Sequence, residues 1–192
     1  MNLPNKLTMS RMAMIILFMI VYFLKSVIGS SYIYILGVIF LIASITDFFD
    51  GYFARKYKLI TTFGKFVDPL ADKLLVISAL FVLSDIYAVN GFSLSYWMPF
   101  WVVLIIVFRE LLVTSIRLVA LGDGKVVAAS HLGKYKTFAT MTMITYYFFL
   151  MPIDTLSIQY IGIGLVVISV LLTLISGIDY FIKNKSIIVK SI

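Results

Sequence analysis

Apolar residues occur along the chain in long continuous runs that are separated by short polar segments. Six of these runs approach the length of a membrane-spanning helix, about 20 residues. They cover residues 11–29, 31–55, 67–88, 96–120, 132–151 and 156–182. The runs do not alternate apolar and polar positions as barrel strands do, and only helices or closed barrels satisfy their backbone groups in lipid. The pattern predicts an all-α, polytopic membrane protein with six transmembrane helices in a single domain, residues 1–192.

The polar segments between the runs alternate in charge. Those after the first, third and fifth runs (GSS, IYAVNGFSLSY and MPIDTLS) contain no Lys or Arg. Basic residues gather instead at the N-terminus, after the second and fourth runs, and in the C-terminal tail. Because cytoplasmic loops carry an excess of Lys and Arg, both termini are predicted to be cytoplasmic. A cleaved signal peptide over the first run is the alternative, and it would leave the orientation of the other runs unchanged.

Composition narrows the class of protein and the kind of site. Of the 192 residues, 62% are hydrophobic, whereas a soluble domain has roughly half. There is no cysteine and only one histidine, so any bound metal would be a hard cation with oxygen ligands. The net charge of +7 is accounted for by the basic cytoplasmic segments. We therefore expect a cell-membrane protein, surrounded by lipid, that has no nucleic-acid partner.

Four aspartates lie at the edges of the second and third runs, in the segment DFFDGYFARKYKLITTFGKFVDPLADK. Asp47 and Asp50 are three apart, and Asp68 and Asp72 are four apart, so each pair shares one face of a helix. Asp47 lies about 24 Å along its run, near the cytoplasmic boundary of a hydrocarbon core about 30 Å thick. Four carboxylates in one place repel one another unless cations lie between them. Such ligands could hold two divalent ions that grip a pyrophosphate.

A structural role is the alternative for these aspartates. Asp68 followed by Pro69 is a good helix start, with Asp as N-cap and Pro at the first helical position. The residues that could pair with the first two aspartates are Arg55, Lys56 and Lys73. The combined spacings, together with Gly51 and Gly64, which permit close approach of a ligand or backbone, favour a metal site.

The segment resembles the signature of the CDP-alcohol phosphatidyltransferase family, D-x2-D-G-x2-A-R followed by G-x3-D-x3-D. The fixed positions are filled by Asp47, Asp50, Gly51, Ala54, Arg55, Gly64, Asp68 and Asp72. The six runs and the predicted cytoplasmic termini are similar to the family's architecture. The resemblance implies an enzyme that transfers a phosphatidyl group from CDP-diacylglycerol to an alcohol and releases CMP.

The resemblance also implies a role for each residue of the signature. Two divalent metal ions, Mg²⁺ or Mn²⁺, would be held by Asp47, Asp50, Asp68 and Asp72. Asp72 would be the general base that takes the proton of the acceptor hydroxyl. The CDP group would be surrounded by Asp47, Asp50, Gly51, Ala54, Arg55 and Gly64.

Basic residues in and after the fourth run predict a second, phosphate-binding site beside the metal site. FRELLVTSIR places Arg109 and Arg117 at membrane depth, where such cations invite an anion. Ser130 is expected to be the N-cap of the fifth helix, whose first-turn N–H groups could bind phosphate together with Lys134. Lys134 and Lys136 are about 200° apart around a helix, so both cannot face the site equally, and Lys134 is favoured.

Two neighbouring residues have structural alternatives. Glu110 could neutralise an arginine within the helix bundle, and His131 is more often a polar interface residue than a substrate ligand. We therefore expect Arg109, Arg117 and Lys134 to hold the acceptor phosphate, with His131 and Lys136 as weaker candidates.

The segments NLPNKLTMSR, FRELLVTSIR and GKYKT are also similar to a bacterial branch of the family, the phosphatidylglycerophosphate synthases. This resemblance implies sn-glycerol 3-phosphate as the acceptor, a short interfacial helix over NLPNKLT, and Asn5 or Arg11 near the nucleotide. Serine, phosphatidylglycerol or an inositol phosphate would be alternative acceptors for the same chemistry. A divalent-cation channel or transporter is the alternative from another class of protein. A homodimer is a further expectation from the family.

Overall fold

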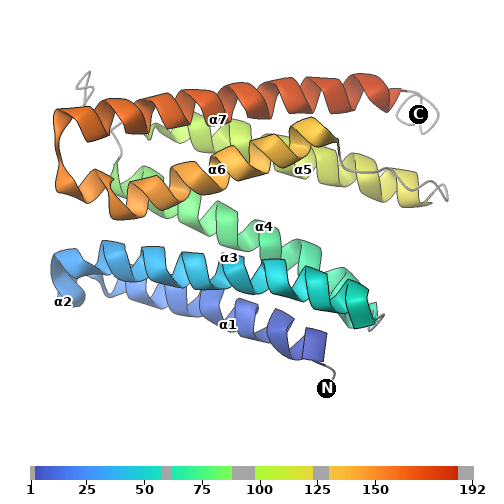
Figure 1. The fold of residues 1–192 in the computed structure, drawn as a ribbon, viewed down its shortest axis with the longest axis horizontal. Coiled ribbons are helices and arrows are strands. Elements are labelled where there is room, and N and C mark those ends of the chain that lie inside the picture. The colour runs from blue at the N-terminus through green and yellow to red at the C-terminus, as the bar shows by residue number, and fades with distance from the viewer. Residues whose placement is uncertain (1–2, 58–61, 88–97, 123–129, 186–192) are drawn as a thin grey trace. The chain divides into compact units, whose positions relative to one another are not determined.

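The computed structural model describes residues 3–57, 62–87, 98–122 and 130–185, and all regular structure within these ranges is helical (Figure 1). Side chains are described over the same ranges except for residues 3–8, 48–57, 62–69, 72, 119 and 121–122. The long helices are α1 (Leu3–Phe23), α3 (Tyr32–Tyr57), α4 (Thr62–Ile86), α5 (Phe100–Gly122), α6 (His131–Phe149) and α7 (Leu156–Lys183). Short turns of helix complete the connections at α2 (Lys25–Ile28), η1 (Gly29–Ser31) and η2 (Met151–Ile153).

The six long helices correspond in order to the six apolar runs, which confirms the all-α prediction for the described residues. Two helical segments there are long and apolar enough to cross a bilayer, Lys25–Asp47 and Leu156–Lys183. Large apolar side chains are widely exposed, among them Phe108 at 68% and Leu118 at 64%. Exposed apolar surface of this extent marks an interaction with lipid or protein. Together with the hydropathy of the helices, it indicates a membrane protein.

The N-terminal residues differ from the expectation. NLPNKLT was expected to form a separate short helix, but α1 runs without a break from Leu3 to Phe23. Pro4 is tolerated because it lies in the first turn, where a backbone N–H has no helical partner. No glycine or proline follows it within α1, so nothing in the sequence separates these residues from the apolar run.

The start of α4 also differs from the expectation. This helix begins at Thr62, so Asp68 and Pro69 lie inside it rather than at its first turn. The interpretation of Asp68 as an N-cap is therefore wrong, and Asp68 is left with no capping role. The connection between α3 and α4, residues 58–61, lies outside the described residues.

The chain folds into two compact units, each assembled from separate parts of the sequence. The first comprises Met1–Leu83 and Thr145–Pro152. In it α1 packs against α3, and Figure 1 shows that these two helices are antiparallel. Three aromatic rings fill its core, with the Phe148 ring centroid 6.0 Å from that of Phe18 and 6.1 Å from that of Phe40.

The second unit comprises Ser84–Ile144 and Ile153–Ile192. In it α5 packs against α7, and the two run parallel (Figure 1). The buried residues of α7 follow one face of the helix at spacings of three or four, and most are small or polar: Gln159, Gly162, Val166, Ser169, Val170, Thr173, Ser176 and Tyr180. Small residues let helices approach closely, and polar ones bond across a helix interface in lipid.

Candidate active site

Helices α3 and α4 carry the four aspartates of the signature. Asp47 and Asp50 lie on α3, while Asp68 and Asp72 lie on α4, so the helical spacing predicted for each pair is confirmed. Asp47 is the one whose side chain is described. The signature residues whose side chains lie outside the described set are Asp50, Gly51, Ala54, Arg55, Gly64, Asp68 and Asp72. Their convergence on metal and nucleotide stays a prediction.

Asp47 is bound by an arginine from a neighbouring helix. Arg11 Nη1 on α1 lies 2.7 Å from Asp47 Oδ1, and the Arg11 side chain is only 1% exposed. A buried guanidinium is costly without an anionic partner, so this ion pair ties α1 to α3. Sequence reasoning had considered only basic residues that follow Asp47 in the chain. The available signal was depth, since Arg11 begins one apolar run and Asp47 lies near the end of the next, antiparallel run.

The aspartates have the right chemistry for divalent metal ions. All four expected ligands are carboxylates, the donors that hard cations prefer. The Asp47 side chain remains 42% exposed beside Arg11, so the ion pair does not enclose the carboxylate. Among the described side chains, no group of three or more His, Asp or Glu is placed to hold a metal. The side chains of Asp50, Asp68 and Asp72 lie outside the described residues. The carboxylate chemistry of all four aspartates fits a divalent metal ion.

In the second unit, Glu110 lies between two cations. Arg109 Nη1 is 3.2 Å from Glu110 Oε1, and Lys136 Nζ binds the same oxygen. Lys136 is buried, and the Arg109 side chain is 12% exposed. The structural alternative for Glu110, neutralisation of an arginine in the bundle, is therefore observed. The same carboxylate oxygen therefore joins α5 to α6 through the Lys136 ammonium.

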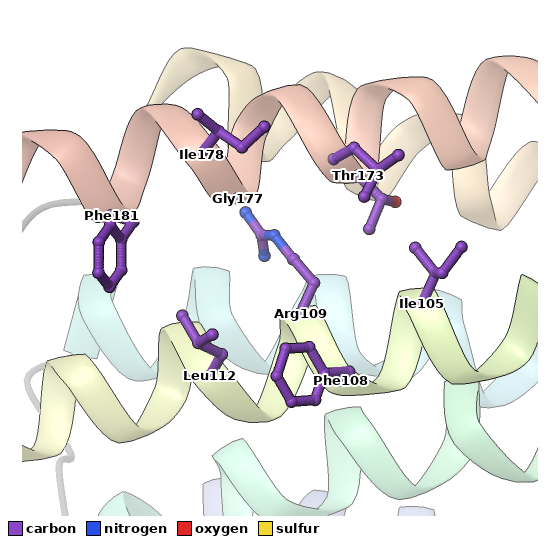
Figure 2. Close-up of a pocket in the computed structure, with 9 residues that line it drawn as sticks. Ile105, Phe108, Arg109, Leu112, Thr173, Gly177, Ile178 and Phe181 are labelled. Atoms are coloured by element: carbon purple, nitrogen blue, oxygen red, sulfur yellow. The ribbon is translucent and has the colours of Figure 1, made fainter.

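Arg109 passes between two glycines. An ideal Cβ built on Gly177 of α7 would lie 3.1 Å from Arg109 Cγ, and one built on Gly133 of α6 would lie 3.9 Å from Arg109 Nη2. Figure 2 shows the Arg109 side chain rising from α5 toward Gly177. The guanidinium therefore reaches the first turn of α6, where the Gly133 N–H donates to Ser130 Oγ at 3.1 Å. The predicted N-cap role of Ser130 is confirmed.

The other basic candidates differ in exposure. Lys134 and His131, in the first turn of α6, are exposed, whereas Lys136 is buried against Glu110. Lys134, which the sequence favoured as the phosphate ligand, is thus the exposed one of the two lysines. Arg117 Nε donates to the hydroxyl of Tyr180 at 3.3 Å.

A cavity of about 310 Å³ lies between α5 and α7 beside the stem of Arg109 (Figure 2). Its lining is almost wholly apolar and consists of Ile105, Phe108, Arg109, Leu112, Thr173, Leu174, Gly177, Ile178 and Phe181.

The sequence as a whole matches one protein family. The family model of CDP-alcohol phosphatidyltransferase matches residues 1–175, which is most of the chain. The chain belongs to this family. Its members are generally dependent on divalent metal ions, in agreement with the carboxylate donors on α3 and α4.

Relatives within the CDP-alcohol phosphatidyltransferase family are similar over almost the full chain. A CDP-diacylglycerol–glycerol-3-phosphate 3-phosphatidyltransferase of Bacillus subtilis is 42% identical, with 95% of each chain covered. A probable phosphatidylglycerophosphate synthase of Mycobacterium tuberculosis is 38% identical over 93% of this chain and 79% of its own. A CDP-diacylglycerol–glycerol-3-phosphate 3-phosphatidyltransferase of Wigglesworthia glossinidia brevipalpis is 33% identical, with 94% and 93% covered.

Proposed function

We propose that this CDP-alcohol phosphatidyltransferase moves the phosphatidyl group of CDP-diacylglycerol to sn-glycerol 3-phosphate, giving phosphatidylglycerophosphate and CMP. The observation that carries the proposal is the similarity, over nearly the whole chain, to relatives named for this reaction. The basic residues of the second unit support a phosphorylated acceptor, because Arg109, from α5, reaches the first turn of α6, where Gly133 lies beside its guanidinium.

The aspartates of α3 and α4 are assigned the metal-binding role. Two ions, Mg²⁺ or Mn²⁺, held by Asp47, Asp50, Asp68 and Asp72 would neutralise charge on the pyrophosphate of the donor. The small residues Gly51, Ala54 and Gly64 leave room for the nucleotide, and Arg55 contributes a charge beside it. Arg11 supports this role by holding Asp47 in place from α1.

The reaction itself is a substitution at the lipid-side phosphorus. Asp72 accepts the proton of the acceptor hydroxyl while the hydroxyl oxygen forms its bond to phosphorus. The bond from that phosphorus to the bridging oxygen breaks, and CMP leaves with the electron pair. A carboxylate placed to take the proton lowers the barrier because the alcohol need not be ionised beforehand.

The basic residues of α5 and α6 are assigned the acceptor phosphate. The set is Arg109, Arg117 and Lys134, with His131 and Lys136 as weaker members. Guanidinium groups form two parallel hydrogen bonds to a phosphate, which fixes its orientation as well as its position.

The chain is assigned six membrane spans, with both termini and the reacting groups on the cytoplasmic side. The strong alternation of basic residues between successive segments supports this orientation. Such a placement suits the two substrates, because the donor's acyl chains lie in lipid while a charged acceptor arrives from water.

An acceptor panel tests the proposal directly. The purified enzyme is given labelled CDP-diacylglycerol and Mg²⁺ or Mn²⁺, together with glycerol 3-phosphate, serine, phosphatidylglycerol or inositol phosphate. We expect lipid product and CMP to form only with glycerol 3-phosphate. Turnover without glycerol 3-phosphate but with another acceptor would overturn the assignment.

A further inference from the structure

The C-terminal half of α7 contacts both arginines of α5. Gly177 and Tyr180 are three residues apart, so they share one face of the helix. Gly177 lies beside the stem of Arg109, and Tyr180 bonds to Arg117. Neither of these α7 residues carries a charge, so neither is itself a phosphate ligand of the ionic kind.

Tyr180 holds Arg117 by two contacts while leaving its phosphate-binding edge to another partner. Arg117 Nε donates to the Tyr180 hydroxyl at 3.3 Å, and Cζ lies 5.5 Å from the ring centroid. The bond consumes Nε and neither of the terminal amino groups, which together can grip a phosphate. Tyr180 is itself fixed, being 2% exposed and packed against Val113 and Ile116. A rigid partner therefore sets the direction in which Arg117 points.

Gly177 sets the path of Arg109 by leaving space. A methyl group at this position would lie 3.1 Å from Arg109 Cγ, which is closer than an unstrained contact allows. The cavity of about 310 Å³ beside the same stem gives Arg109 room to yield. A side chain at position 177 would therefore displace the guanidinium rather than unfold the helix pair.

From these contacts we infer that the Gly177–Tyr180 face of α7 positions the two arginines that bind the acceptor phosphate. The inference rests on the proposed function, which assigns that phosphate to Arg109 and Arg117. Gly177 and Tyr180 are positioning residues, because they act on the substrate only through the arginines.

The first experiment removes a single oxygen. Tyr180→Phe keeps the buried ring and its contact with the guanidinium, and loses the bond to Nε. We expect KM for glycerol 3-phosphate to rise about three- to tenfold, the effect of losing one rather long bond to a charged group. KM for CDP-diacylglycerol and the thermal midpoint in detergent should stay unchanged. The matched control is Tyr160→Phe, an exposed tyrosine on the same helix.

A double-mutant cycle shows whether the tyrosine acts through the arginine. Lysine has no guanidinium group, so Arg117→Lys already lacks the hydrogen bond from Nε to the Tyr180 hydroxyl. In that background, Tyr180→Phe should cause no further rise in KM. An equal rise in both backgrounds would overturn the positioning role.

The second experiment adds a methyl group. Gly177→Ala should raise KM for glycerol 3-phosphate severalfold without lowering the thermal midpoint. The matched control is Gly164→Ala on the same helix, because a Cβ at position 164 would have no neighbouring atom within 4 Å. If both variants leave KM unchanged while the wild-type enzyme uses glycerol 3-phosphate, this inference is overturned and the proposed function stands. If the wild type does not use glycerol 3-phosphate, the proposed function falls and this inference falls with it.

Discussion

Arg11 Nη1 on α1 lies 2.7 Å from Asp47 Oδ1 on α3, an ion pair that involves the first aspartate of the signature. In the proposed metal site this positive charge would lower the repulsion among the four carboxylates. The pair also fixes one side of Asp47 and leaves the carboxylate partly open. Such a contact resembles the outer partners that orient metal ligands in other proteins.

Replacing Arg11 should therefore weaken metal use. In Arg11→Gln the orienting charge is lost, and we expect the Mg²⁺ or Mn²⁺ concentration for half-maximal activity to rise by about tenfold or more. Arg11→Lys keeps the charge but lacks the planar guanidinium, so its metal concentration for half-maximal activity should lie between those of Arg11→Gln and the wild type. Activity is measured across a metal titration after chelator treatment. Equal metal requirements in all three proteins would show that Arg11 only packs α1 against α3.

Asp72→Asn tests the proposed base. An amide cannot accept the hydroxyl proton, so turnover should fall by about 10² or more in saturating metal. Asp85→Asn is the control, since this exposed aspartate lies on the same helix and outside the signature. Because Asp72 is also an expected metal ligand, the rate is measured at several metal concentrations. Unchanged turnover in a normally folded variant would remove Asp72 from this role.

Glu110 is expected to contribute to stability through Lys136. Glu110→Gln takes the Glu110 carboxylate away from the buried Lys136 ammonium, which should lower the free energy of unfolding by about 3 kcal/mol. Adding Lys136→Met removes the ammonium that has lost this carboxylate and should restore most of that loss. The measurement is reversible unfolding in detergent. A double variant no more stable than Glu110→Gln would show that the pair is not the source of the effect.

The orientation can be tested because the chain has no cysteine of its own. Ser157→Cys lies in a segment that the charge pattern places outside, and Lys185→Cys lies in the basic tail that it places inside. A membrane-impermeant maleimide added to intact cells should label only the residue-157 variant. Permeabilised cells should show labelling of both. Labelling of the residue-185 variant in intact cells would reverse the predicted topology.

Much of the fold followed from local pattern. The apolar runs predicted the six long helices, and the spacing of each aspartate pair placed it on one helix face, as α3 and α4 show. The inward face of α7 was equally available from the sequence. Its small and polar residues recur at spacings of three and four between Gln159 and Tyr180, within a helix otherwise rich in Leu and Ile. Reading that stripe would have pointed to Tyr180 as an interface residue.

What the sequence could not supply was the pairing of distant residues. Asp68 was open to interpretation as an N-cap because Pro69 follows it, yet α4 begins six residues earlier. The partner of Asp47 is 36 positions away in the chain, and Tyr180 is 63 positions from Arg117. Such contacts depend on which helices pack together and in which register, and local propensity carries no information about either.

Gly37 illustrates how closely two elements of the first unit approach. A Cβ at this position would lie 2.8 Å from Phe148 Cβ and 2.9 Å from the Phe149 ring. Phe148 Cβ is bonded directly to the backbone, so it cannot yield by a side-chain rotation. Gly37→Ala should therefore lower the free energy of unfolding by about 1–3 kcal/mol, although alanine is the better helix former.

The control for Gly37 is again Gly164→Ala, which gains helix propensity without meeting any atom within 4 Å. It should be neutral or more stable by up to about 1 kcal/mol. The two substitutions should change the free energy of unfolding, measured in the same detergent, in opposite directions. That result would separate the effect of close packing from that of helix propensity. If Gly37→Ala were as stable as Gly164→Ala, α3 and the end of α6 would not be in contact at this position, and the aromatic core around Phe148 would have to be arranged differently.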